Sequence, residues 1–316
     1  FNGFLLESVE HGERWSRWSF IGRNPLLTIK KIDSQLLVEG EIPIEFDVNG
    51  QILESVRALQ RTLSAPQIEN FPPMYSGLLG YLGYDTVREI EDLPTPANDD
   101  LQVPDAILSV IGEVAAFDHW SQRVFLIANA IVKPQSSESE IAESYYETKN
   151  RLDSLMLDGA KPLSEPLLDP PNLNTNSVEV KSTMSENDYC GIVEKAKDYI
   201  LAGDIFQVVL SQRFDFDLEA NPFDVYRVLR QINPSPYMYF VKNEEVTLVG
   251  CSPEPLIQLR DNTITSRPIA GTRKRGLTQT EDQALAHSLL EDPKELAEHI
   301  MLVDLARNDL GRISDF

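Results

Sequence analysis

Two glutamates near the end of the chain have the spacing of a divalent-cation site. Glu295 and Glu298 are three residues apart within residues 292–311, a stretch that predicts a single helix. Residues three apart lie on the same side of a helix, so both carboxylates would face one way. Mg2+ is commonly bound by one or two carboxylates together with substrate oxygens and water. The alternative is that Glu295 caps the helix and Glu298 is solvated, because carboxylates are common in first helical turns.

The boundaries of this helix follow from the residues at its two ends. Asp292 suits the N-cap, Pro293 the first helical position, and Gly311 the C-terminal stop. Apolar residues recur between them at helical spacing and predict a stripe that faces a core. The stripe consists of Leu296, Ile300 and Val303, widened by Met301 and Leu305.

A basic loop precedes the helix, at residues 266–276. Gly271 would let the backbone approach a ligand closely, and Thr272 offers a hydroxyl group. The loop also holds the only dense basic cluster of the chain, which suits a carboxylate substrate. The cluster comprises Arg267, Arg273, Lys274 and Arg275. The alternative is a solvated basic turn.

Composition narrows the classes of partner. The 316 residues include 50 acidic and 28 basic ones, which gives a net charge of −22. Such a charge argues against binding to nucleic acid and to anionic membranes, so anionic ligands need local sites. The two cysteines, Cys190 and Cys251, form no disulfide or zinc pattern and favour a reducing cytoplasm. Cys251 is better explained as a small buried residue than as a nucleophile.

Strands and helices alternate without strict βαβ order, which predicts an α+β fold with antiparallel β-sheets packed with helices. We expect strands at residues 17–22, 26–32, 35–38, 106–110, 123–130, 205–214, 237–241, 245–249, 256–260 and 263–266, with a hairpin tip at 117–120. Further helices are expected at 52–62, 140–155, 186–202 and 222–232. The glycines of residues 75–85 fit no phosphate-binding motif and indicate close strand packing.

Composition also suggests where the chain divides into domains. Residues 158–184 are rich in Pro, Asn and Ser, show no hydrophobic periodicity and predict a linker. We therefore expect an N-terminal domain at 1–157 and a second domain at 185–316.

Four runs of residues together resemble the chorismate-utilising enzymes. They are QVVLSQR at 207–213, SPE at 252–254, PIAGT at 268–272 and the helix at 295–311. Within that family the resemblance is strongest to the large subunits (component I) of anthranilate synthases. It spans the whole chain and implies the chorismate-utilising enzyme fold, incomplete here because family members continue beyond the helix. We expect a longer gene product and no turnover by residues 1–316 alone, and the abrupt start at Phe1 suggests a missing N-terminal piece.

The resemblance implies roles for particular residues. Glu298 would coordinate Mg2+ with Glu295 beside the metal, and Glu295 and Thr272 would be catalytic. Chorismate would bind at Ala270, Gly271 and Thr272. The segments at 5–8 and 233–238 match those that form a tryptophan feedback pocket in the family. Its expected residues are Glu7, Ser8, Pro236, Tyr237 and Met238, although residues 5–8 alone would pass for an ordinary edge strand.

The implied reaction converts chorismate and ammonia to anthranilate and pyruvate in tryptophan biosynthesis. Ammonia would come from glutamine through a partner amidotransferase subunit, because neither cysteine belongs to a Cys–His–Glu arrangement. A hetero-oligomer is therefore expected. Ala270 argues against the alternative, aminodeoxychorismate synthase, whose members commonly carry a nucleophilic lysine at that position. A further alternative is a non-catalytic tryptophan-binding fragment.

Overall fold

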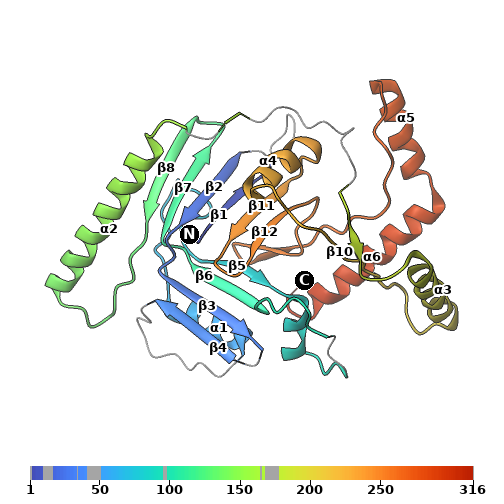
Figure 1. The fold of residues 1–316 in the computed structure, drawn as a ribbon, viewed down its shortest axis with the longest axis horizontal. Coiled ribbons are helices and arrows are strands. Elements are labelled where there is room, and N and C mark those ends of the chain that lie inside the picture. Colours follow the sequence, from blue (N-terminus) through green and yellow to red (C-terminus); the bar gives the residue numbers. More distant parts are fainter. Residues whose placement is uncertain are drawn as a thin grey trace. The chain divides into compact units, whose positions relative to one another are not determined.

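The computed structural model describes residues 2–9, 17–33, 35–40, 51–94, 98–163, 166–167 and 178–315. They form antiparallel sheets with helices between and beside the strands, which confirms the α+β prediction (Figure 1). Two compact units are present, residues 1–165 with 229–316 and residues 166–228. In the described part of the chain, no helix combines the length and apolar character needed to cross a membrane.

The larger sheet joins the two ends of the sequence. Its six strands lie in the order β12-β11-β1-β2-β7-β8, and every neighbouring pair is antiparallel (Figure 1). The strands are β1 (Gly3–Glu7), β2 (Trp18–Arg23), β7 (Glu113–Asp118), β8 (Arg123–Ala128), β11 (Tyr237–Lys242) and β12 (Thr247–Ser252). Strands from both predicted domains therefore share one sheet, while the predicted domain boundaries themselves stay a prediction.

A four-stranded sheet lies in the order β4-β3-β6-β5. Its strands are β3 (Leu27–Ile32), β4 (Gln35–Gly40), β5 (Leu78–Leu82) and β6 (Ala106–Val110). A Cβ atom at Gly80 would lie 1.8 Å from the carbonyl oxygen of Ile107, so β5 and β6 approach closely only because residue 80 is glycine. Close packing, the interpretation given to the glycine run, is therefore confirmed at Gly80 and at Gly83, whose Cβ atom would lie 2.8 Å from the Asp105 carbonyl oxygen, but not at Gly77, where nothing lies within 4 Å.

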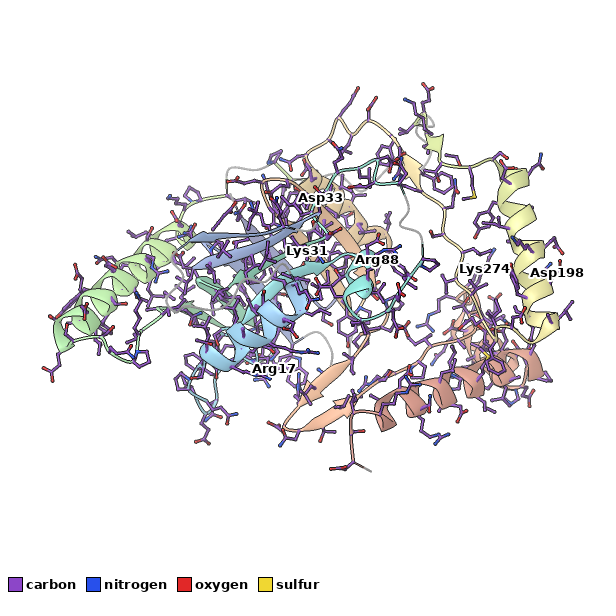
Figure 2. All side chains as sticks on the ribbon, turned by 90° about the horizontal axis from the view of Figure 1, so that it is seen from below. Arg17, Lys31, Asp33, Arg88, Asp198 and Lys274 are labelled. Atoms are coloured by element: carbon purple, nitrogen blue, oxygen red, sulfur yellow. The ribbon has the colours of Figure 1, made fainter. Side chains whose placement is uncertain are left out.

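Helix α1 (Ile52–Thr62) packs its apolar face on this sheet but has no cap from its own N-cap residue, Gln51. Glu89, in the short 3-10 helix η1 (Tyr84–Glu89), instead accepts hydrogen bonds from the Ile52 and Leu53 backbone N–H groups at 2.9 and 3.0 Å. Lys31 of β3, labelled in Figure 2, donates to the same carboxylate at 2.5 Å. Glu89, a residue distant in sequence, thus caps the N-terminus of α1.

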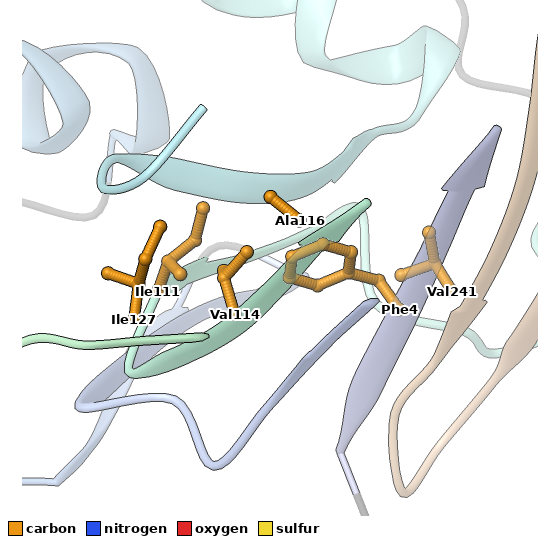
Figure 3. Packing of buried hydrophobic residues seen from close by; sticks show 6 residues of the cluster. All are labelled: Phe4, Ile111, Val114, Ala116, Ile127 and Val241. Atoms are coloured by element: carbon orange, nitrogen blue, oxygen red, sulfur yellow. The ribbon is translucent and has the colours of Figure 1, made fainter. Parts of the chain in front are cut away.

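The core of the larger sheet is made from both ends of the chain (Figure 3). Phe4 of β1, Val114 of β7 and Val241 of β11 pack in one cluster. Alternation along each strand places these side chains on the same face of the sheet. The cluster also contains Ile111, Ala116 and Ile127.

The remaining helices are α2 (Glu138–Gly159), α3 (Glu186–Ala202), α4 (Pro222–Ile232), α5 (Gln279–Leu290) and α6 (Pro293–Gly311). Two-residue strands β9 (Lys181–Ser182) and β10 (Phe214–Asp215) pair, as do β13 (Gln258–Arg260) and β14 (Thr263–Thr265). The predicted ends of α3 are confirmed, because Ser185 caps its first turn and Gly203 ends it at φ +82°. Both cysteines are free.

Three expectations are corrected by the structure. The strand predicted at 205–214 is absent except for the first residue of β10, because residues 205–213 find no partner strand in the described chain. Strand β7, in contrast, was not predicted.

The apolar stripe of α6 does not face a core, since Leu296 is 48% and Ile300 59% exposed. The linker predicted at 158–184 overlaps the last two residues of α2, which runs to Gly159, and its middle, 164–165 and 168–177, lies outside the described residues.

Candidate active site and ligand pocket

The basic loop lies against the first turn of α6. Gly271 has φ +50°, a left-handed conformation that favours glycine. A Cβ atom at this position would lie 2.6 Å from Oε2 of Glu295 and 3.1 Å from Cδ1 of Leu289. The loop backbone therefore lies beside the Glu295 carboxylate, which would have to move if residue 271 carried a side chain. The structure thus brings together the predicted substrate loop and the predicted metal helix.

Arg273 ties the loop to the helix. Its Nη1 donates to Oε1 of Glu295 at 3.2 Å, and its Nη2 donates to Oδ2 of Asp292 at 2.7 Å. Asp292 is the predicted N-cap and accepts from the backbone N–H groups of Glu295 and Lys294. These backbone hydrogen bonds, the one to Glu295 foremost, outweigh desolvation and with Arg273 hold the pKa of Asp292 below its usual value.

The far end of the loop is also anchored. Arg275 donates to Oδ2 of Asp282 in α5 at 2.8 Å, and the Gly276 backbone N–H donates to Oδ1 of the same residue at 2.9 Å. Lys274, labelled in Figure 2, lies between these two anchors. The C-terminal half of the loop is therefore held by carboxylates of α5 and α6, which a merely solvated turn would not require.

The other predicted substrate residues lie beside Gly271 in the loop. Ala270 is half-buried and Thr272 is exposed. The Thr272 carbonyl oxygen accepts from Nη1 of Arg273 at 3.0 Å, which fixes the backbone at this position. The Thr272 hydroxyl is thus carried on a fixed backbone at an exposed position.

The acidic face of α6 fits a magnesium ion that relies on substrate and water for most of its ligands. Glu298 is half-buried, and Glu295 already shares its carboxylate with Arg273. Among the described residues no three His, Cys, Asp or Glu side chains gather closely enough to enclose a metal. Mg2+ needs only one or two protein carboxylates when a substrate supplies oxygens. The donor set of Glu298 and Glu295 satisfies that requirement.

A second feature, the β1–β11 pocket, is a cavity of about 1260 Å3 beside the pairing of β1 with β11. Glu7 pairs in register with Met238, and the Val9 backbone N–H donates to the Ser235 carbonyl oxygen at 3.0 Å. The five residues expected at a tryptophan site all line this cavity. They are Glu7, Ser8, Pro236, Tyr237 and Met238.

The cavity also contains residues that sequence reasoning missed. Arg17 donates through Nε and Nη2 to both carboxylate oxygens of Asp118, at 3.0 and 2.7 Å. Its guanidinium carbon lies 4.9 Å from the ring centre of Trp18 and 5.3 Å from that of Trp120. The hydrogen bond from Arg17 holds the pKa of Asp118 well below its usual range. No local motif signals this pair, because its members are 101 residues apart.

The chain is similar to known proteins over nearly its whole length. The family model for chorismate binding enzymes matches residues 4–316. The chain is 40% identical over 316 residues to anthranilate synthase component 1 of Acetivibrio thermocellus, covering 99% of this chain and 63% of that protein. It is 40% identical over 319 residues to the component 1 of Mycobacterium tuberculosis (strain ATCC 25618 / H37Rv), covering 98% of this chain and 61% of that protein.

A solved structure is similar as well. The crystal structure of anthranilate synthase component I from Streptococcus pneumoniae TIGR4 superposes with a TM-score of 0.77 at 32% identity, covering 98% of this chain and 64% of that one. The chain thus spans less than two thirds of the length of each of these relatives. The family match over residues 4–316 shows that this chain belongs to the chorismate binding enzyme family.

Proposed function

We propose that this chain is the chorismate-binding part of an anthranilate synthase large subunit, which converts chorismate and ammonia to anthranilate, pyruvate and water. The observation that carries the proposal is the contact between the Gly271 backbone and the Glu295 carboxylate. It brings together a loop suited to binding an anion and a helix suited to binding a cation. The likeness to component 1 proteins over nearly the whole chain supports the same conclusion.

In this proposal the loop binds substrate and α6 supplies carboxylates. The backbone at Ala270 and Gly271 and the hydroxyl of Thr272 contact chorismate, while Arg273 keeps the loop in place through Asp292 and Glu295. Glu298, with Glu295 beside it, would hold Mg2+. When bound, Mg2+ would balance the charge of the substrate carboxylate and assist the loss of a hydroxyl group, which is a poor leaving group.

The proposed chemistry proceeds in two stages. Ammonia forms a bond to ring carbon C2, and the C4 hydroxyl leaves as water after taking up a proton. The enolpyruvyl C–O bond then breaks, the ring loses its C2 proton to become aromatic, and the side chain takes up a proton to leave as pyruvate. Glu295 and Thr272 would orient substrate and water for these proton transfers.

Ammonia would come from a separate glutamine amidotransferase subunit in a cytoplasmic hetero-oligomer. Cys190 is exposed on α3, and Cys251 accepts a hydrogen bond from Asn233. Neither the exposed position of Cys190 nor the contact of Cys251 with Asn233 supplies the histidine that activates a cysteine nucleophile. The proposal therefore assigns glutamine hydrolysis to a partner.

Tryptophan is the proposed feedback ligand of the β1–β11 pocket. The carboxylate of Glu7 suits its ammonium group, and apolar side chains such as Phe20, Phe71 and Met74 line the same cavity and suit its indole ring. Because the cavity lies beside the joint of β1 with β11, a bound ligand would act where distant parts of the chain meet.

Aminodeoxychorismate synthase is the second candidate, and Ala270 speaks against it because an alanine cannot attack the ring. The products separate the two activities. Anthranilate formed directly supports the first proposal, whereas para-aminobenzoate formed after addition of the matching lyase supports the second. Tryptophan binding without any turnover by the complete gene product would indicate a non-catalytic binding protein.

The metal assignment is tested by substituting Glu298 in the complete gene product. Glu298→Ala is expected to lower Mg2+-dependent turnover by about a hundredfold or more, the size of a lost catalytic interaction, and to leave tryptophan binding unchanged. Asp304→Ala is the matched control, because Asp304 lies on the same helix and pairs only with Arg307 among the contacts described. Activity of the Glu298→Ala variant within about twofold of the control would refute the assignment.

A further inference from the structure

Glu7 is the centre of a hydrogen-bonded network on the wall of the β1–β11 pocket. Its Oε2 accepts from Nε of Arg230 at 2.9 Å, and its Oε1 lies 3.5 Å from Nη2 of the same guanidinium. Arg230 lies in the last turn of α4. A cation therefore already occupies one edge of the carboxylate that the proposed ligand would use.

Ser19 holds the other side of Glu7. Its hydroxyl donates to Oε1 at 3.3 Å and lies 2.7 Å from Nε2 of His119. Ser19 faces Glu7 across the β1–β2 pairing and is only 6% exposed. The orientation of the carboxylate thus depends on a buried contact within the sheet, independent of Arg230.

The two contacts differ in how strongly the structure fixes them. The Glu7 side chain is 12% exposed, whereas that of Arg230 is 47% exposed. A long, half-exposed arginine gains little net free energy from such a pair. The guanidinium can therefore leave Glu7 more readily than Ser19 can.

The hydroxyl of the neighbouring residue, Ser8, is a further polar group of the pocket. Ser8 Oγ is buried and has no hydrogen-bond partner among the described residues, although Ser8 lines the same pocket as Glu7. Buried polar atoms without a partner are uncommon. Ser8 therefore offers a second polar group in the cavity that Glu7 lines.

We propose that Arg230 is the resident counter-ion of Glu7, displaced by the ammonium group of an amino-acid ligand, and that Ser19 positions the carboxylate for that exchange. The inference rests on the proposed tryptophan site. Ligand binding would then release Arg230 from β1 and free the last turn of α4.

The test compares tryptophan binding to the complete gene product and its variants by isothermal titration calorimetry. Arg230→Gln removes the competing cation, so tryptophan should bind about threefold tighter, which corresponds to one partly exposed ion pair. Ser19→Ala should bind it about threefold more weakly, as expected for one lost hydrogen bond. Arg227→Gln is the matched control because Arg227, on the same helix, pairs with Asp224.

Indole-3-propionate separates a positioning role from a structural one, because it keeps the indole ring and carboxylate of tryptophan but lacks the ammonium. Its affinity should not increase in Arg230→Gln and should stay unchanged in Ser19→Ala. Thermal melting of each variant checks that it folds, and Arg230→Lys, which keeps the charge, should bind tryptophan as the unsubstituted chain does.

The outcomes distinguish the inferred exchange of Arg230 from the proposed tryptophan site on which it rests. If the unsubstituted chain binds no tryptophan, both the feedback site and the exchange are refuted. If that chain binds tryptophan but Arg230→Gln binds it equally or more weakly, the exchange is overturned while the feedback site stands. Opposite changes in Arg230→Gln and Ser19→Ala, confined to the ligand with an ammonium group, would establish the exchange.

Discussion

At the scale of single residues, the candidate active site depends on Gly271. Its left-handed conformation is strained for any residue with a side chain, and a Cβ atom there would displace the Glu295 carboxylate. Sequence alone indicated that this glycine would let the backbone approach a ligand. The structure shows that the backbone lies beside Glu295 of the helix proposed to bind metal, an arrangement that no spacing rule could give because the two positions are 24 residues apart and α5 lies between them.

Gly271→Ala is therefore expected to impair turnover by the complete gene product by roughly a hundredfold, since a displaced catalytic group commonly has an effect of that size. Folding should weaken by only about 1–2 kcal/mol from backbone strain. Gly191→Ala in α3 is the control, because nothing lies within 4 Å of a Cβ atom there, and it should stabilise the helix by about 0.5–1 kcal/mol. Full activity in the Gly271→Ala variant would refute the proposed role of this contact.

At the scale of elements, α1 shows how a residue distant in sequence can cap the N-terminus of a helix. Glu89 accepts from the first backbone N–H groups of α1 and pairs with Lys31. Burial raises the pKa of Glu89, but the hydrogen bonds from Lys31, Leu53 and Ile52 together outweigh burial and lower it below the usual value. The carboxylate form is therefore favoured by the fold.

Replacing Glu89 by Gln should lower the free energy of unfolding by about 2 kcal/mol at pH 7, the upper range for a lost helix cap. A lowered pKa means that the stabilisation is complete above the unfolded value of about 4.3 and is lost as the pH falls through the folded value. Urea unfolding at pH 7 and at lower pH checks both points. A difference between the two chains that stays constant as the medium is acidified would contradict the account.

The accuracy of the sequence predictions also varied by element. Helix ends with local capping signals, such as Ser185 and Asp292, were predictable because the cap and the N–H groups it accepts from lie within one turn. The strand at 205–214 was not, because strand formation requires a partner. Phe206 is 81% and Val209 86% exposed, although the mostly apolar run at 205–210 is typical of a strand.

At the scale of the whole molecule, the fold unites β1 with β11. Phe4 and Val241 share one core cluster although they belong to the two predicted domains. The resemblance named two segments that lie side by side in the structure, but no sequence period reveals that residues 3–7 pair with 238–242. That pairing places five predicted residues around one cavity.

Val241→Ala should consequently destabilise the N-terminal strands. The loss of two methyl groups from the core is expected to lower the free energy of unfolding by about 1–3 kcal/mol. Amide hydrogen exchange should accelerate in β1 and β2 as well as in β11. Faster exchange confined to residues 237–252 would show that the two ends of the chain do not share a cooperative core.

The central claim is tested most directly by supplying the complete gene product with chorismate, ammonium and Mg2+ and following the fluorescence of anthranilate. The account predicts that anthranilate forms without a lyase, requires Mg2+ and Glu298, and is suppressed by tryptophan. Formation of para-aminobenzoate only after a lyase is added, or anthranilate formation that persists in Glu298→Ala, would contradict it.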